Sequence, residues 1–261
     1  MIKRELKTNL KSFILWTSIL IGIFLVVFLV YPFIITDDTV RNLDEMMKVF
    51  PPEILKTFNM DLSSINSAYG WLKSEGFMFV LIIIGIYSSI LGSNIVLKEE
   101  YDRTIEYISY LPIKRKTILT NKIIVSIIYI ISMTLILGIF NYIALILSGD
   151  FNQKQYILLS ITPIFVALPL FAINLFISTF MHKKTFGLSL GIVFIFYILN
   201  ILSELSDNVN FLKYFSIYTL ADTRNVISKI EINPLMAILS TVITSIFLLA
   251  TYIRYEKKEL I

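Results

Sequence analysis

The stretch Phe13–Ile35, FILWTSILIGIFLVVFLVYPFII, carries no charged residue over 23 positions. An α-helix needs about 20 consecutive apolar residues to cross the hydrocarbon core of a bilayer. A helix suits that environment because its backbone groups bond to one another and none is left facing lipid. The stretch therefore predicts a membrane-spanning helix.

Five further stretches repeat this pattern, and none of them contains Asp, Glu, Lys, Arg or His. They cover residues 77–97, 123–147, 156–180, 186–202 and 235–253. We therefore expect an all-α polytopic membrane protein with six transmembrane helices in a single domain, 1–261. In the fourth span, Pro163 and Pro169 predict a kink or a local unwinding.

Composition agrees with this fold class. Hydrophobic residues make up 56% of the 261 positions and charged residues only 16%, whereas a soluble domain carries about 25% charged residues. The net charge of +4 is modest and its basic residues are dispersed, which argues against a nucleic-acid partner. Cysteine is absent and His182 is the single histidine, so disulfides, thiolate sites and histidine-based metal centres are not expected.

Orientation follows from the distribution of Lys and Arg. If the N-terminus is cytoplasmic, the cytoplasmic segments hold fifteen of the 23 basic residues, although the segments on the other side are longer. We therefore predict that both termini are cytoplasmic in a plasma membrane. The outside loops are then 36–76 and 203–234. In the second, Phe211–Leu220 is apolar but too short to cross, which fits a re-entrant or interfacial segment or an ordinary surface helix.

The spans contain no ionisable residue, which argues against a proton- or ion-coupled carrier because such proteins keep charges inside the membrane as relays. The chain also has no GxxxxGK[ST] loop that could cradle nucleotide phosphates. We expect a chain that is not an enzyme and holds no cofactor or metal. If ATP drives it, ATP and Mg²⁺ bind to a separate partner subunit.

Amides and small residues are the notable side chains within the spans. Candidate pathway-lining residues are Asn94, Asn141, Asn174 and Asn200, although hydrogen bonding between helices is the more common role of such amides. Small residues let helices approach closely in lipid. They occur in the second span as Gly85, Ser89 and Gly92, and in the fifth span as Gly187 and Gly191. Each set fits packing either within one subunit or against a second one.

Two segments on the predicted cytoplasmic side are candidates for docking another protein. Residues 1–12 place apolar side chains at near-helical spacing with lysines on another face, which predicts an amphipathic interfacial helix. That helix could also continue into the first span. The second segment covers residues 98–122 and, with the preceding Leu97, reads LKEEYDRTIEYISYLPIKRKTILTNK. It predicts two short helices separated at Pro112. Alternatively, their basic cluster Lys114–Lys116 only sets topology and contacts anionic lipid.

The loop resembles a pattern in the membrane subunits of type-2 ATP-binding-cassette (ABC) exporters, the small six-span bacterial permeases encoded apart from their ATPase. There an acidic residue precedes Gly-Thr, an aliphatic residue and Glu, and then Leu-Pro, a basic residue and Lys follow. The matching positions here are Glu99 or Glu100, Thr104, Ile105, Glu106, Leu111, Pro112, Arg115 and Lys122, with Arg103 in place of the glycine. The segment FPPEILKTFNMD at 50–61 and the tail Tyr252–Leu260 are also similar to that family.

The resemblance implies two permease subunits paired above two ABC ATPase subunits, as a homodimer or with a related paralogue. It implies that the N-terminal helix and the coupling loop 98–122 dock the ATPase, that spans two and five line the pathway, and that span five approaches the partner. The implied coupling residues are Glu99, Glu100, Thr104, Glu106, Pro112, Arg115 and Lys122.

Our hypothesis from the sequence is therefore a permease subunit of an ATP-driven exporter. Its spans suit a hydrophobic or amphipathic substrate, and within the resembling family a peptide is favoured. A non-transporting membrane scaffold or assembly protein is the alternative, and an ion-coupled carrier is a third.

Overall fold

The computed structural model describes most of the chain. For residues 74, 75 and 207 it describes the backbone but not the side chain. The described residues are 1–34, 45, 67–102, 113–149, 151–183, 186–205 and 207–258. Three predicted coupling residues, Thr104, Glu106 and Pro112, lie outside them, as does most of the loop 36–76, of which residue 45 and residues 67–76 are described.

Every regular element in the described residues is helical, and six segments among them are long and apolar enough to cross a membrane. The spanning helices are α1 (Ile2–Ile34), α6 (Phe77–Tyr101), α8 (Arg115–Ser148), α9 with α10 (Gln153–Ile161 and Pro163–Ser178), α11 (Phe186–Leu205) and α13 (Pro234–Lys257). The predicted six-span, all-α fold is confirmed, and each predicted span lies almost wholly within one of these segments.

The N-terminal stretch 1–12 does not form a separate helix, because α1 runs from Ile2 to Ile34 without interruption. This corresponds to the second of the two arrangements expected for it. With 33 residues, α1 is about 50 Å long, whereas the hydrocarbon core is about 30 Å thick. The first turns of α1 therefore extend beyond the apolar span.

The fourth span is divided where proline predicts it. Helix α9 ends at Ile161 and α10 begins at Pro163, which has no backbone N–H and is suited to the first position of a helix. The Thr162 N–H bonds to the Leu159 carbonyl at 3.1 Å, a tightened last turn. At Pro169, by contrast, α10 continues as a helix.

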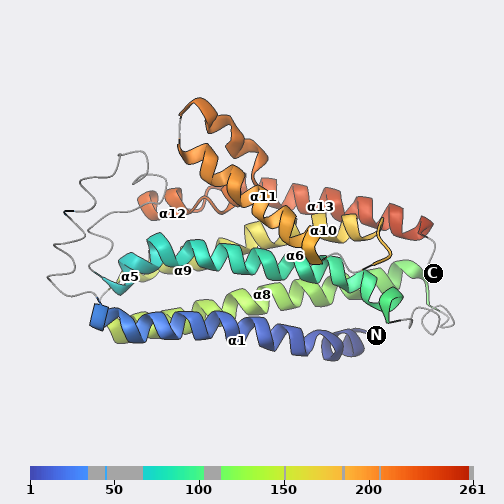
Figure 1. Ribbon diagram of the computed structural model, residues 1–261, viewed down its shortest axis with the longest axis horizontal. Helices are drawn as coiled ribbons and strands as arrows, with labels where there is room; N and C mark the ends of the chain where they lie inside the picture. The colour runs from blue at the N-terminus through green and yellow to red at the C-terminus, as the bar shows by residue number, and fades with distance from the viewer. Residues whose placement is uncertain are drawn as a thin grey trace.

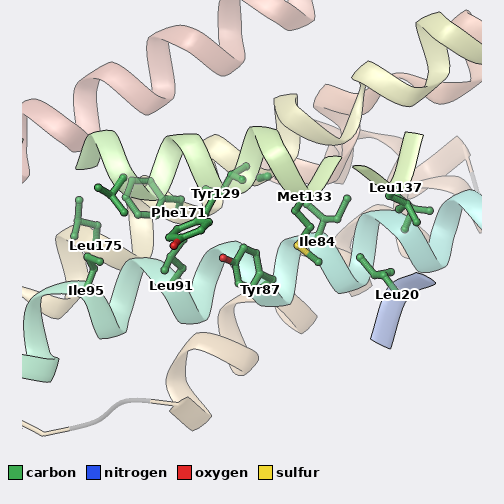
Figure 2. Packing of buried hydrophobic residues seen from close by; sticks show 14 of the residues in the cluster. Leu20, Ile84, Tyr87, Leu91, Ile95, Tyr129, Met133, Leu137, Phe171 and Leu175 are labelled. Atoms are coloured by element: carbon green, nitrogen blue, oxygen red, sulfur yellow. The ribbon is translucent and has the colours of Figure 1, made fainter. Parts of the chain in front are cut away.

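Helix α6 lies at the centre of the bundle, where it packs along α10 and also contacts α1, α8 and α11 (Figure 1). Figure 2 shows part of the apolar core that results. The labelled side chains are Leu20 from α1, Ile84, Tyr87, Leu91 and Ile95 from α6, Tyr129, Met133 and Leu137 from α8, and Phe171 and Leu175 from α10. Helix α13 also packs against α10 and adds Tyr255 to this core.

Hydroxyl groups inside the spans bond mainly to their own helices. Ser88 Oγ donates to the Gly85 carbonyl at 3.0 Å, and Thr134 Oγ1 donates to the Ile130 carbonyl at 3.0 Å. Such bonds satisfy a buried hydroxyl where no water is present. Ser240 Oγ instead crosses from α13 to the Phe165 carbonyl of α10 at 2.8 Å.

The segment between the last two spans folds into three short helices. They are η2 (Asp207–Phe215), η3 (Ile217–Ala221) and α12 (Thr223–Lys229). Helix η2 turns back along α11, and η3 packs against α10, α11 and α13 (Figure 1). The apolar stretch Phe211–Leu220 is therefore split between two short helices that meet at Ser216.

Both chain termini lie at the same end of the bundle (Figure 1). We call this the terminus end, and α6 ends there while α8 begins there. At the opposite end are α12 and the short helices α5 (Ala68–Trp71) and η1 (Leu72–Gly76).

Candidate functional site

Six charged side chains meet at the terminus end, where several helices begin or end. This terminal ionic cluster consists of Arg4, Glu5, Glu99, Glu100, Lys122 and Lys258. The Arg4 side chain is 48% exposed. The other five residues are buried, Lys122 to 1% and Lys258 to 3% exposure. Three cations and three carboxylates balance one another, as buried charges require.

The first half of the cluster is centred on Glu99, in the last turn of α6. Its Oε1 lies 2.7 Å from Nη2 of Arg4 in α1 and 3.0 Å from Nζ of Lys122 in α8. Lys122 Nζ also lies 3.5 Å from the Glu5 carboxylate and donates to the Ile95 carbonyl at 2.8 Å. The ends of α1, α6 and α8 are thus joined through one buried lysine and its carboxylates.

The second half is centred on Glu100, whose Oε1 lies 2.7 Å from Nζ of Lys258, directly after α13. Lys258 Nζ also donates to the Met181 carbonyl at 2.7 Å, beyond the end of α10. The exposed ring of His182 approaches Glu100 Oε2 at 3.5 Å. Adjacent residues on a helix point about 100° apart, so Glu99 and Glu100 reach different neighbours.

Arg115, at the first turn of α8, connects the same end to the tail of the chain. Its Nη1 donates to the Lys258 carbonyl at 2.9 Å and to the Glu256 carbonyl at 3.4 Å. Beside it, Lys116 and Glu256 form an exposed ion pair at 3.2 Å. The end of α13 is therefore fixed to α6, α8 and α10 together.

The ionic contacts of the cluster join the ends of five helices. Breaking a buried ion pair by removing one partner costs about 3–5 kcal/mol, so these contacts hold five helix ends in fixed relation. Among the described residues, no three His, Cys, Asp or Glu side chains are grouped so that they could hold a metal ion.

The whole chain matches one known family. Residues 1–260 match the family described as ABC-2 family transporter protein. The chain belongs to the ABC-2 transporter family. It is the membrane permease subunit of an ABC transporter, which associates with an ABC ATPase and lies in a lipid membrane. No curated protein and no solved structure matches the chain.

The permease brings together four of the residues that sequence reasoning assigned to coupling. Glu99, Glu100 and Lys122 are buried in the terminal ionic cluster, and Arg115 lies beside it. Sequence reasoning missed Arg4, Glu5 and Lys258. No local pattern marks a flanking charge for an ion pair with a distant part of the chain, so the sequence could not single out these three residues.

The two sets of small residues in the permease have opposite surroundings. In α6, a Cβ added at Gly92 would lie 2.4 Å from the Phe171 carbonyl oxygen, and one added at Gly85 would lie 2.5 Å from the Tyr218 hydroxyl. Ser89 is fully buried. In α11, a Cβ at Gly187 or Gly191 would meet nothing within 4 Å. The α6 set packs within the subunit, whereas the α11 set faces away from the described part of the chain.

The candidate pathway amides are also separated by the structure. Asn141 and Asn174 are buried inside the subunit, and Asn174 Nδ2 donates to the Leu170 carbonyl of its own helix at 2.9 Å. Asn94 is half-buried, and Asn200 lines a cavity at the opposite end. Asn94 and Asn200 are therefore the more accessible members of that set.

Proposed function

We propose that the permease is half of an ATP-driven exporter and that its ATPase docks at the terminus end. The terminal ionic cluster is the observation that supports this most. Helix α6 ends at Tyr101, directly before the central part of the predicted coupling loop, and α8 begins at Arg115, directly after it. Force applied to that loop would act on two helix ends that Glu99 and Lys122 join.

The cluster would distribute this force to the rest of the subunit. Glu99 and Lys122 connect α6 and α8 to α1, and Glu100 connects α6 to Lys258 after α13. Because Glu99, Glu100 and Lys122 are buried, they would act behind the docking surface rather than in contact with the ATPase. The surface itself would be formed by exposed basic residues of α1 and of the start of α8, together with the loop.

A second copy of the permease would pair through α11. Its uncovered face combines Gly187 and Gly191 with exposed Ile195, Ile198 and Leu202 at helical spacing. Small residues allow close helix contact in lipid, where apolar side chains alone do not drive association. Two permeases and two ATPases would then form the complex, with the substrate pathway between the permeases.

The direction and the substrate class are inferred from the distribution of charge and from the apolar spans. The Lys and Arg distribution supports cytoplasmic termini, which places the proposed ATPase site on the side where ATP is available. A pathway between apolar spans suits a hydrophobic or amphipathic substrate, and the exporter resemblance favours a peptide.

The orientation can be tested directly because the chain has no cysteine. Single-cysteine variants K257C and K154C would be labelled in intact cells with a membrane-impermeant maleimide. Cytoplasmic termini require K154C to react in intact cells and K257C to react only after permeabilisation. The reverse pattern would contradict the proposed site of the ATPase.

Coupling can be tested by coexpression with the ATPase and measurement of ATP hydrolysis by the purified complex in nanodiscs. The double variant E100Q/K258M removes both charges of a buried pair, so neither is left uncompensated. We expect it to assemble but to lose the effect of the permease on ATP hydrolysis. The matched control is K116Q/E256Q, which removes the exposed pair at the same end. Equal, wild-type hydrolysis by both variants would rule out a coupling role for Glu100 and Lys258.

The docking role of the loop has a separate test. The variant E106K reverses a charge that the family resemblance assigns to the ATPase contact. We expect it to weaken copurification of the ATPase. Full assembly and full permease-dependent ATP hydrolysis by E106K would remove Glu106 from the docking surface.

A further inference from the structure

At the opposite end of the bundle, the structure contains a cavity of about 760 Å³. It is lined by η1 and the start of α6, the second half of α11, the short helices η2, η3 and α12, and the start of α13. Three spanning helices begin or end at its walls. The cavity therefore lies at the depth where the hydrocarbon core gives way to the head groups.

One wall of the cavity is apolar and belongs to the spans. Phe77, Met78 and Leu81 of α6 line it, with Ile201 of α11 and Met236 of α13. This wall could accommodate a hydrocarbon chain entering from the bilayer.

The other wall carries an excess of positive charge. Four basic residues, Lys73, Lys213, Arg224 and Lys229, line the cavity together with the acidic Glu204 and Asp222. Arg224 Nη2 lies 2.7 Å from Glu204 Oε2, which compensates one charge of each sign. Among the side chains that the structure describes, Lys73, Lys213 and Lys229 have no carboxylate within ion-pair distance. Three lysines from three different elements thus line one cavity whose described lining holds a single further carboxylate, that of Asp222. Two of these lysines also lie near aromatic rings, with Lys73 Nζ 5.9 Å from the centre of the Tyr69 ring and Lys213 Nζ 5.2 Å from that of Tyr214.

The basic wall is held in place by an unusual backbone. Asp222 and Ile230, at the two ends of α12, have φ angles of 43° and 57° and are the non-glycine residues with positive φ in the described chain. Such strained positions cluster at functional sites. The Gln155 Nε2 group also donates to the Ile227 carbonyl at 2.6 Å and anchors α12 to α9. The backbone that carries Lys229 is therefore fixed against α9.

We propose that this cavity binds an anionic phospholipid. The phosphate group lies among the ammonium groups of Lys73, Lys213 and Lys229, and an acyl chain lies along Phe77, Met78 and Leu81. Basic pockets between transmembrane helices bind anionic head groups in this way. The site lies within one subunit, so it does not depend on the proposed pairing of permeases or on ATPase docking.

The test is native mass spectrometry of the detergent-solubilised full chain with palmitoyl-oleoyl phosphatidylglycerol, and with the phosphatidylcholine that has the same acyl chains. We expect the wild type to prefer phosphatidylglycerol. In the variant K73Q/K213Q/K229Q, the ratio of phosphatidylglycerol to phosphatidylcholine binding should fall about tenfold or more. The reason is that each lysine near a membrane surface contributes roughly fivefold to the binding of an anionic lipid. The matched control K3Q/K7Q/K257Q makes the same change of charge at exposed positions of the terminus end. It should retain the preference.

Two further measurements distinguish binding of a whole phospholipid from binding of a phosphate anion alone. Met78→Trp places a larger side chain at the apolar wall and leaves less space for an acyl chain. It should reduce phosphatidylglycerol binding severalfold without altering the lysines. Inorganic phosphate should raise the unfolding temperature of the wild type less than phosphatidylglycerol does. An unchanged preference in the cavity variant would overturn the proposal. So would stabilisation by phosphate alone with no preference for phosphatidylglycerol, because the cavity would then be a site for a free anion.

Discussion

Helices α6 and α11 look alike in sequence but lie in different environments. Both are apolar spans with glycines at helical spacing, and both carry glutamates near the end. In the most apolar window of α6, 78% of residues are buried, against 17% in α11. The glycines of α6 contact the backbone of α10 and a hydroxyl of η3, whereas those of α11 have no neighbour in the described part of the chain within 4 Å of an added Cβ. The same pattern therefore serves internal packing in one helix and leaves a free surface on the other.

The glutamate ion pairs at the two helix ends show the same contrast. Glu99 and Lys122 at the end of α6 have side chains that are 8% and 2% exposed. Glu204 of α11 and Arg224 have side chains that are 25% and 50% exposed. Water screens the second pair but not the first, so the two pairs should differ greatly in their effect on stability.

Removing the buried lysine should have the largest effect. We expect K122M to lower the free energy of unfolding by about 3–5 kcal/mol, because the buried carboxylates of Glu5 and Glu99 lose a cation. The measurement is denaturant unfolding of the purified permease in detergent micelles. The double variant E99Q/K122M should be less destabilised than K122M. A change below about 1 kcal/mol in K122M would mean that the cluster is screened like a surface pair.

Adding one methyl group to α6 should have the next largest effect. We expect G92A to cost about 1–3 kcal/mol, because its Cβ would force α6 and α10 apart and overpack the core. The thermal unfolding temperature of the permease measures this. The matched control G191A meets no neighbour. It should be neutral or slightly stabilising, since Ala exceeds Gly in helix propensity by about 1 kcal/mol. Equal destabilisation of both variants would remove the distinction between the two helices.

Enlarging the free face of α11 should affect association rather than folding. We expect G191L to leave the unfolding temperature unchanged and to reduce the dimer fraction severalfold, because close contact of two α11 helices needs small residues. Cross-linking in native membranes, with light scattering in detergent, measures the dimer fraction. An unaltered dimer fraction in G191L would show that the permeases pair through another surface.

The exposed pair at the end of α11 should have the smallest effect. We expect R224Q to change the free energy of unfolding by about 1 kcal/mol or less, because exposed ion pairs contribute little. The same unfolding assay compares it with K122M. If R224Q lowered the free energy of unfolding as much as K122M does, the Glu204–Arg224 pair would not be screened by water as we infer.

Most of the fold could be predicted from the sequence, because the requirement for about 20 apolar residues applies to each span separately. The predicted span 186–202 corresponds to α11, which extends to Leu205. The break before Pro163 was predicted from the chemistry of proline alone. The candidate site was predicted only in part. Glu99 and Lys122 were found through the loop resemblance, whereas Glu5 and Lys258 come from distant parts of the chain.

The sequence by itself determined that the chain crosses the membrane six times and keeps its apolar spans free of charge. Only the tertiary structure decided that Gly92 packs inside the subunit while Gly191 faces outward, and that Lys122 is buried rather than solvated. The physical reason is that lipid and protein interior are equally apolar. Hydrophobicity therefore identifies a span but does not tell which of its faces, or which flanking charge, another helix covers.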